Sequence, residues 1–293
     1  MKKQIIGSGL SGLVGSRIVE LLSSQFEFEN LDLMSGINIL NLNEIEPKIA
    51  NSKAKTFIHL AAFTDVNAAW QERNNKNGLC YQINVLGSAN IAKLCQKYHK
   101  FLVHFSTDFV FDGKKITPYA EKDKPNPIEW YGQTKFLAEK EIENSGCEFC
   151  IVRIAFPFRE NFADKTDLVR KMIESFKNKN LYPMFFDQKI TPTFIDDIAA
   201  GIKIILNKKP EGIYHLVGST FLSPYELAKK IAKLVNFDSS LIKKTSLFNY
   251  LKDHPESRPY HKNLALSNEK AKKQLGIEMK TIDEVIHVFK KTN

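Results

Sequence analysis

Short apolar runs alternate with longer amphipathic stretches along the first half of the chain. Short runs bounded by turn residues are typical of buried strands, whereas apolar residues at every third or fourth position indicate helices. We predict strands at 3–6, a second ending at Asp32, then 37–40, 56–62, 101–105 and 149–154. The predicted helices lie after the glycines near residue 15, at 42–49, at 79–98 and from the prolines at 125–127 to Gly146. This alternation predicts an α/β fold with a doubly wound parallel sheet.

The pattern changes after residue 154. An aromatic loop at 156–162 precedes a helix to about Lys177 and a turn at 181–183. Further elements are a helix from Asp196 through Leu206, a strand at 213–217, and a helix that Ser223 and Pro224 begin and that ends near Val235. We therefore expect a dinucleotide-binding domain at 1–155 and a smaller α/β domain, mainly substrate-binding, at 156–293. We expect segments at about 187–220 to return to the first sheet, and the remainder of the chain after Val235, including 257–259, to form a substrate lid.

Composition sets limits on the class of protein. With 293 residues and 43% hydrophobic content, the chain can bury a full core. It has no apolar run near the ~18 residues of a membrane span, so we expect a cytoplasmic protein without a membrane partner. Cys147 and Cys150 have the spacing of a metal or redox pair, but no second pair completes a zinc site, and we predict no metal.

The net charge of +9 comes almost wholly from lysine. The lysines are spread in pairs along the chain and do not alternate with aromatic residues, so we predict solvated helix faces and no nucleic-acid partner. A positive field would still attract a nucleotide diphosphate.

Glycines at positions 9, 12 and 15 separate the first strand from the first helix. In that place glycines permit a tight turn and close approach of a pyrophosphate to the helix N-terminus. The pattern favours a Rossmann domain that binds a dinucleotide. A Walker A loop is excluded because no Gly-Lys-Ser/Thr follows.

The choice between NADH and NADPH rests on two charged residues. Asp32 lies near the distance at which a carboxylate accepts hydrogen bonds from the adenosine ribose, which favours NADH. Arg17, two residues after Gly15, either pairs with a 2′-phosphate and offsets that preference or points into solvent. We predict that both cofactors are used.

The proposed chemistry lies in two short segments. Thr107 follows the strand at 101–105 and would face the crevice at the carboxyl end of the sheet. Tyr131 and Lys135 are four residues apart in a predicted helix, so they share one face. An ammonium beside a phenol lowers the pKa of the tyrosine, which makes Tyr131 a candidate proton donor to a carbonyl, with Thr107 holding the same oxygen. An isolated pair of this spacing is more often a surface Tyr and Lys.

Taken together, these motifs resemble the extended short-chain dehydrogenase/reductase superfamily, and within it the dTDP-4-dehydrorhamnose reductase family. The resemblance covers nearly the whole chain. It rests on the glycine motif, Ser106–Gly113 (STDFVFDG), Tyr131-x-x-x-Lys135, Asp187-Gln188 with Pro192-Thr193, Tyr214-His215-Leu216 and Arg258-Pro259.

The family implies a reaction in which NADH or NADPH reduces a nucleotide-linked 4-keto sugar of the dTDP-4-keto-6-deoxyhexose class. The catalytic residues would be Thr107, Tyr131 and Lys135, and the substrate would contact Thr107, Asp108, Phe156 and Arg258. A homodimer is compatible with the family. The cofactor would be lined by Gly9, Gly12, Leu13, Val14, Gly15, Asp32, Asn38, Ala61, Ala62, Phe63, Thr64, Phe105, Tyr131 and Lys135.

The sequence departs from the family pattern at four positions. Phe109 stands where Tyr is usual, Asn38 where Asp is frequent, Trp70 where Glu follows the Val-Asp-x-Ala pattern, and Phe156 where Trp is familiar. Two alternatives therefore remain. One is an epimerase or dehydratase of the same fold, although dehydratases place Glu at the position of Phe109. The other is a non-catalytic NADP-binding regulator similar to the regulatory subunit of methionine adenosyltransferase.

Overall fold

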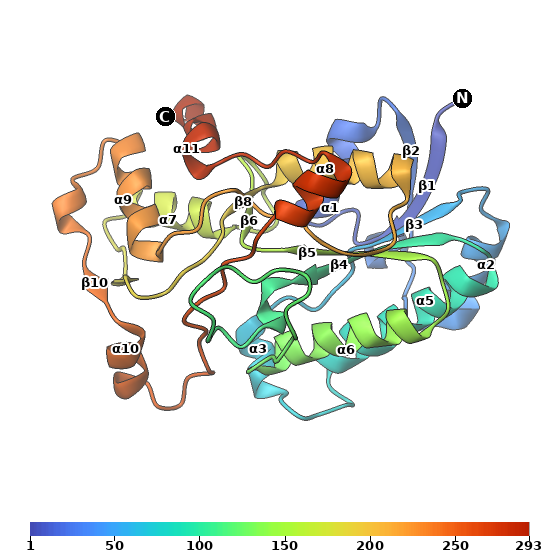
Figure 1. Cartoon of the computed structure of the whole chain (residues 1–293), viewed down its shortest axis with the longest axis horizontal. Coiled ribbons are helices and arrows are strands. Elements are labelled where there is room, and N and C mark those ends of the chain that lie inside the picture. Colours follow the sequence, from blue (N-terminus) through green and yellow to red (C-terminus); the bar gives the residue numbers. More distant parts are fainter. Residues whose placement is uncertain (293) are drawn as a thin grey trace.

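A computed structural model describes residues 1–292 and is built on a six-stranded parallel sheet. The strand order is β2-β1-β3-β4-β5-β9 (Figure 1). The order reverses at β1, so its carboxyl end and that of β3 border the crevice where such sheets bind ligands. The bounds are β1 Lys3–Ser8, β2 Phe26–Asn30, β3 Thr56–His59, β4 Phe101–Thr107, β5 Phe149–Ile154 and β9 Gly212–His215.

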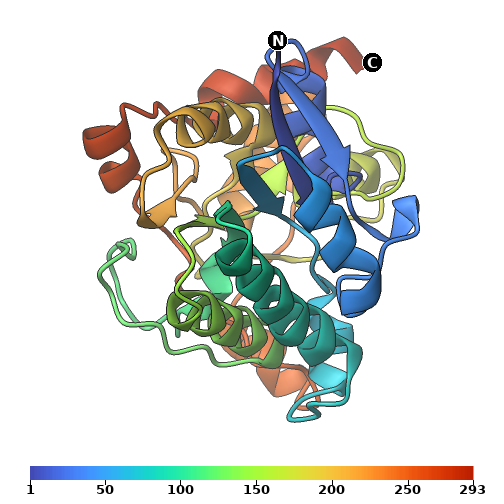
Figure 2. The same cartoon turned by 90° about the vertical axis from the view of Figure 1, so that its right-hand side faces the viewer.

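Two helix layers cover the sheet (Figure 2). Helices α1 (Leu13–Leu22) and α8 (Ile195–Lys208) pack on one face, where Ile18 and Ile202 meet Ile5 and Val103. Helices α2 (Leu42–Asn51), α5 (Ser88–Lys97) and α6 (Trp130–Asn144) cover the other. Neighbouring strand residues such as Ile5 and Ile6 belong to opposite cores, so the central strands are apolar on both faces. The predicted α/β fold with a doubly wound parallel sheet is therefore confirmed.

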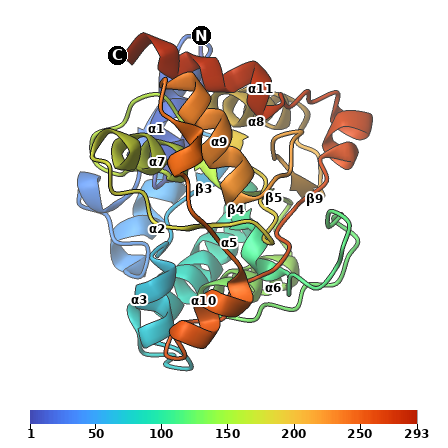
Figure 3. The same cartoon turned by 90° about the vertical axis from the view of Figure 1, so that its left-hand side faces the viewer.

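A smaller lobe lies beside the carboxyl ends of the strands, with α7 (Leu168–Lys177), α9 (Pro224–Leu234) and α10 (Leu247–Asp253) facing the viewer in Figure 3. Its core contains Phe158, Met172, Phe176 and Ile231. Ser223 and Pro224 begin α9, as the sequence predicted, and Ser223 forms a capping box with Glu226. The other elements are the strand pairs β6 (Pro157–Phe158) with β8 (Thr193–Phe194) and β7 (Met184–Phe185) with β10 (Lys244–Thr245), the short helix α11 (Ile282–Val285), the π-helical turn Ala271–Leu275, and the 3-10 segments Ser239–Leu241 and Ile286–Thr292.

The predicted strand at 37–40 is wrong. Gly36 has a positive φ of 75°, and the Asn38 side chain accepts a hydrogen bond from the Leu40 backbone, so the chain turns instead of extending. Ile39 is nevertheless buried, because its side chain packs closely on Gly87. A Cβ at Gly87 would lie only 2.5 Å from Ile39 Cδ1. Ile39 is apolar because its loop packs on a helical segment. The spacing of apolar residues does not distinguish such a loop from a buried strand.

Four other segments in the first half of the chain differ from expectation. The second strand ends at Asn30, and Asp32 instead caps the 3-10 turn Leu33–Ser35. The predicted helix at 79–98 is α4 (Leu79–Tyr81), a π-helical turn (Gln82–Gly87) and α5 in succession. Helix α3 (Val66–Gln71) and the 3-10 turn Asp108–Val110 were not predicted. Of the helices in residues 1–292, none combines the length and apolar character that crossing a membrane demands.

Candidate functional site

The glycine loop packs tightly against the residues that follow β3. Gly9 has a φ of 74°, and a Cβ there would lie 2.4 Å from the Ala61 nitrogen. A Cβ on Gly15 would lie 2.3 Å from the Gly9 oxygen. A Cβ on Gly12 would meet only that same oxygen, at 3.4 Å, so Gly12 faces open space. The N-terminus of α1, which has no side-chain cap and no acidic residue in its first turn, thus opens toward a cavity with its backbone N–H groups free for an anion.

This cavity, of about 560 Å³, runs along the carboxyl ends of β1, β3 and β4. Its bare glycine cradle and uncapped helix end fit the pyrophosphate of a dinucleotide. The predicted residues that line it are Gly9, Gly12, Leu13, Val14, Gly15, Ala61, Ala62, Thr64, Phe105, Thr107, Asp108, Tyr131, Lys135 and Phe156.

Four predicted residues do not line this cavity: Asp32, Asn38, Phe63 and Arg258. Asp32 lies one contact behind the wall, where its carboxylate accepts hydrogen bonds from the Ser11 hydroxyl (2.8 Å) and the Met34 nitrogen (2.9 Å). Burial raises the pKa of Asp32, but these hydrogen bonds outweigh it and hold the pKa below its usual value. Ser11 is therefore the side chain through which Asp32 reaches the cavity.

Arg17 takes neither of the two positions considered from the sequence. Its Nε and Nη2 donate to the two carboxylate oxygens of Asp196 at 2.7 and 2.8 Å, and Nη1 donates to Glu20 at 2.8 Å. The hydrogen bonds with Asp196 raise the pKa of Arg17. A guanidinium held by two carboxylates joins α1 to α8 and is not available to a 2′-phosphate without breaking those contacts.

Tyr131, Lys135 and Thr107 converge on one wall of the cavity. The Lys135 ammonium donates to the Phe105 backbone oxygen at 2.7 Å and lies 3.4 Å from His104 Nε2. Burial lowers the pKa of Lys135 to about 8. The Thr107 hydroxyl donates to Asp108 Oδ1 at 2.9 Å.

The expected lowering of the Tyr131 pKa is wrong for this arrangement. Burial raises the pKa of Tyr131 strongly, the nearby Thr107 hydroxyl opposes this in part, and the charge of Asp108 adds to the rise. The Lys135 ammonium donates to the Phe105 oxygen, and burial of the phenol has the largest effect on the Tyr131 pKa. Tyr131 is consequently a phenol at neutral pH and can act as a proton donor.

Two buried carboxyl groups flank Tyr131. Burial raises the pKa of Asp108 to about 7, against the opposing Thr107 hydrogen bond, and its Oδ2 has no hydrogen-bond partner within residues 1–292. Burial also raises the pKa of Glu129 to about 7, although Glu129 caps α6 by accepting from the Tyr131 and Gly132 nitrogens at 2.9 and 2.6 Å. The cap fixes the position of Tyr131 at the start of the helix.

Asn84, in the π-helical turn, holds the other side of the cavity. Its amide accepts from the Phe63 nitrogen at 2.8 Å and donates to the Phe63 oxygen at 3.1 Å. It also donates to the Thr134 hydroxyl at 3.0 Å. Phe63 therefore shapes the cavity through its clamped backbone, and its side chain packs near Trp130 instead.

An aromatic pocket of about 250 Å³ adjoins the cavity and shares Phe109, Phe156 and Leu168 with it. Phe109 packs edge-on against Tyr131, with ring centroids 5.7 Å apart. Phe156 has a φ of 41°, a left-handed conformation that is rare for a large side chain and directs the chain from β5 into the smaller lobe. The remaining lining residues are Met172, Tyr182, Pro183, Met184, Phe185, Gln188, Pro224, Arg258, Tyr260, His261 and Leu264.

Arg258 belongs to this aromatic pocket. Its guanidinium lies 4.1 Å from the ring centroid of Tyr260 and 5.8 Å from that of Phe109. Its Nε donates to Asn67 Oδ1 at 3.1 Å, which joins the 257–259 segment to α3. Sequence reasoning missed these aromatic partners of Arg258, because Phe109 is distant in the chain and Tyr260, two residues after Arg258, carries no motif.

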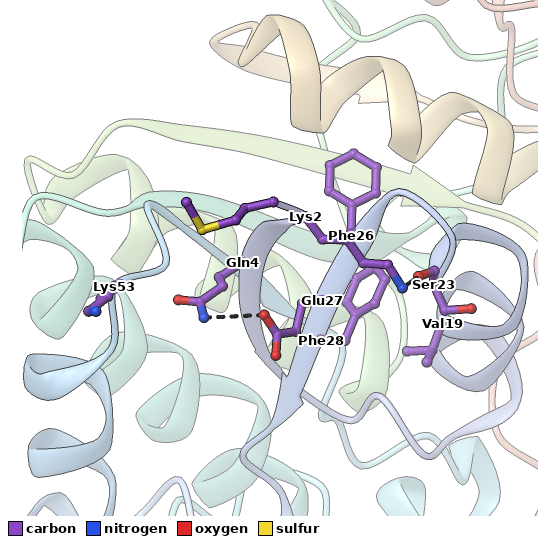
Figure 4. A pocket seen from close by; sticks show the side chains of 9 residues that line it. Lys2, Gln4, Val19, Ser23, Phe26, Glu27, Phe28 and Lys53 are labelled. Atoms are coloured by element: carbon purple, nitrogen blue, oxygen red, sulfur yellow. Dashed lines mark hydrogen bonds between the residues drawn. The ribbon is translucent and has the colours of Figure 1, made fainter.

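A further hollow lies near the amino-terminal ends of the strands and is separate from this site. It is lined by Lys2, Gln4, Phe26 and Phe28 near the amino-terminal ends of β1 and β2 (Figure 4). Gln4 donates to Glu27 there at 3.2 Å. Ligands of doubly wound sheets bind at the carboxyl ends of the strands, so this hollow is not part of the candidate site.

The parallel sheet, the glycine loop and the Thr107, Tyr131 and Lys135 wall are those of an extended short-chain dehydrogenase/reductase. More narrowly, the chain belongs to the RmlD substrate binding domain family, whose model matches residues 2–292. Members of this family are NAD(P)-dependent reductases.

Among known proteins, the chain is 25% identical over 290 residues to the probable low-salt glycan biosynthesis reductase Agl14 of Haloferax volcanii, covering 94% of each chain. It is 29% identical to methionine adenosyltransferase 2 subunit beta of Bos taurus, over 70% of this chain and 61% of that protein. A crystal structure of dTDP-4-dehydrorhamnose reductase from Bacillus anthracis in complex with NADP superposes with a TM-score of 0.87 at 25% identity, covering 100% of this chain and 99% of that one.

Proposed function

We propose that this protein is an NADPH- or NADH-dependent reductase of a nucleotide-linked 4-keto sugar, similar to dTDP-4-dehydrorhamnose reductase. The observation that carries the proposal is the position of Tyr131 and Thr107 in the lining of the dinucleotide-sized cavity, with Tyr131 packed against Phe109, which this cavity shares with the aromatic pocket. A carbonyl placed here would lie beside two hydroxyl groups and near the aromatic pocket.

In the proposed mechanism, the bound dinucleotide supplies the hydride. The Thr107 hydroxyl holds the carbonyl oxygen of the sugar, and the Tyr131 phenol gives that oxygen a proton as negative charge develops on it. Because burial keeps the pKa of Tyr131 above its usual value, the proton is present at neutral pH. The buried Lys135 would hold the nicotinamide ribose, and its ammonium would stabilise the phenolate that proton transfer leaves on Tyr131.

The substrate half of the proposal rests on the aromatic pocket. Arg258 is the charged side chain among its lining residues, and guanidinium groups bind phosphates in a bidentate manner. The surrounding aromatic rings offer faces on which a base can stack. A nucleotide diphosphate sugar would thus place its phosphates near Arg258 and its sugar near Phe109, Phe156 and Tyr131.

The test is the oxidation of NADH and NADPH, followed optically, with a panel of nucleotide 4-keto sugars. Turnover with at least one of them, abolished in Tyr131→Phe, supports the proposal. Binding of NADPH without turnover of any keto sugar would favour the second candidate, a non-catalytic regulator. The similarity to methionine adenosyltransferase 2 subunit beta is the observation that supports this second candidate. A dehydratase is disfavoured because Phe109 cannot serve as an acid or base.

A further inference from the structure

Residues 159–168, here called the strap, run from the smaller lobe along the open side of the dinucleotide cavity. Lys165, Thr166, Asp167 and Leu168 line the cavity together with the glycine loop. None of them was singled out by a sequence motif. The strap is therefore a wall of the cavity that comes from the other half of the chain.

One end of the strap is fixed to helix α1. The buried Arg159 donates from Nη1 to the Ser16 hydroxyl at 3.0 Å and from Nη2 to the Glu20 carboxylate at 2.8 and 2.9 Å. Asp167, also buried, accepts from the Arg159 nitrogen at 3.3 Å and from Arg170 Nε at 2.7 Å. These contacts hold the strap against the helix whose N-terminus faces the cavity.

The other end reaches across the cavity. The Lys165 ammonium donates to the Thr64 hydroxyl at 2.6 Å, and Thr64 lies beyond β3 on the opposite wall. The backbone oxygen of Lys165 is itself held by Arg170 Nη2. Lys165 thus spans the gap between the strap and the residues that follow β3.

The chemistry of this crossing points to an anionic ligand. The other charged side chains that line the cavity are Asp108, Lys135 and Asp167. Lys135 is buried at the floor, and Asp167 is already paired with Arg170. Lys165 is exposed at the rim; within residues 1–292 its ammonium donates to the neutral Thr64 hydroxyl and feels the charge of Asp65. A hydroxyl is a weaker partner for a cation than a phosphate oxygen.

On these grounds, and resting on the proposed binding of NADPH or NADH, we propose that Lys165 is a pyrophosphate-binding residue of the dinucleotide site. When the dinucleotide binds at the N-terminus of α1, the Lys165 ammonium exchanges the Thr64 hydroxyl for a pyrophosphate oxygen. The strap then closes the cavity with an ion pair to a phosphate oxygen in place of a hydrogen bond to a neutral hydroxyl.

The test measures binding of NADPH and NADH by calorimetry, without any sugar substrate, in the wild type, Lys165→Gln and Lys177→Gln. Lys177 lies exposed at the end of α7 and does not line the cavity, so its variant loses the same charge elsewhere. We expect Lys165→Gln to raise the Kd of both dinucleotides alike by about tenfold, the scale of a hydrogen bond to a charged group. Lys177→Gln should change either Kd by less than about twofold, as a screened surface charge does.

Raising the ionic strength should weaken binding more in the wild type than in Lys165→Gln, because one phosphate contact has been removed. Equal Kd values for the wild type and Lys165→Gln would overturn the inference. So would a loss confined to NADPH, because it would assign Lys165 to the 2′-phosphate. A wild type that binds neither dinucleotide would overturn the proposed function as well, which separates the two failures.

Discussion

The Lys135 ammonium nitrogen lies 2.7 Å from the backbone oxygen of Phe105, and this hydrogen bond anchors a buried cation beneath the candidate catalytic tyrosine. Burial lowers the pKa of Lys135 to about 8, so holding its proton in the folded protein has a cost in stability. The shifted pKa of Lys135 should therefore be detectable in the pH dependence of the free energy of unfolding.

We expect Lys135→Met to lose turnover and to alter the pH dependence of stability. The pKa is near 10.4 in an unfolded chain and lower in the folded one, so between about pH 8 and 10 the unfolded state binds more protons. Stability contributed by this group is therefore lost as pH falls through 8 and regained as pH rises toward 10. As pH rises through this window, the free energy of unfolding of the wild type should increase relative to that of Lys135→Met by on the order of 1 kcal/mol per pH unit. Urea unfolding at pH 7, 8.5 and 10 measures the difference, and a difference that stays constant would contradict the buried, shifted lysine.

Tyr131→Phe should lower kcat by at least ~100-fold, because positioned acid catalysis contributes on that scale. Binding of the dinucleotide should remain, since the ring keeps its edge contact with Phe109. Tyr225→Phe removes a hydroxyl on α9, outside both cavities, and serves as the matched control. Stopped-flow single turnovers would show whether the chemical step itself is slowed. A Tyr131→Phe protein with most of its turnover would remove Tyr131 from the mechanism.

Arg258→Ala should raise KM for the nucleotide sugar by about tenfold and leave KM for the dinucleotide nearly unchanged. The reason is that Arg258 lines the aromatic pocket and not the larger cavity. Arg73→Ala is a fitting control, because Arg73 also lies over an aromatic ring, Trp70, but outside both spaces. Equal rises in both KM values would argue against separate binding spaces.

Gly12→Ala and Gly15→Ala should separate ligand binding from folding. A methyl at Gly15 would lie 2.3 Å from the Gly9 oxygen, so the loop must shift and Tm should fall by several degrees, the effect of about 1–3 kcal/mol. A methyl at Gly12 meets only one atom at 3.4 Å, so Tm should hold while the Kd of the dinucleotide rises. Thermal unfolding and dinucleotide titration of both variants check this, and a destabilised Gly12→Ala would show that the cradle is packed more tightly than described.

Arg17→Ala should leave the choice between NADH and NADPH unchanged. We expect the wild type to use both within about tenfold, roughly 1.4 kcal/mol. Since Asp196 and Glu20 occupy Arg17, its removal should alter the ratio of kcat/KM values by less than about threefold, or roughly 0.7 kcal/mol. Steady-state kinetics with each dinucleotide measure the ratio. A loss of NADPH use alone would show that Arg17 leaves its two carboxylates for the 2′-phosphate.

Much of the fold could be predicted from local pattern. The strands at 3–6, 101–105 and 149–154 have apolar runs between turn residues, and the structure places them in the sheet. The strand at 37–40 failed because Ile37 and Ile39 are apolar for packing on α5 and its neighbours, while the αL turn at Gly36 bends the backbone. Burial alone does not reveal whether the backbone is extended.

For the candidate site, residues that carry a motif could be predicted and residues that depend on tertiary approach could not. Gly12, Thr107 and Tyr131 sit at strand or helix ends that sequence order identifies. Lys165 and Tyr260 reach the site only because the smaller lobe folds back over the sheet. The pKa of Tyr131 could not be predicted either, since burial of the phenol in the folded structure outweighs the effect of a lysine one helical turn away.

The return of the chain to the sheet through α8 and β9 restricts how this protein can diversify. Ile198 and Ile202 of α8 fill the core below α1, and β9 completes the sheet next to β5. A recombination event that exchanged the smaller lobe as one piece would remove both elements and leave β5 as an open edge. Exchange of the smaller lobe by gene shuffling would therefore require two separate cuts. If Phe156 and Arg258 contact the substrate as proposed, point substitutions around them are the shorter route to a new substrate.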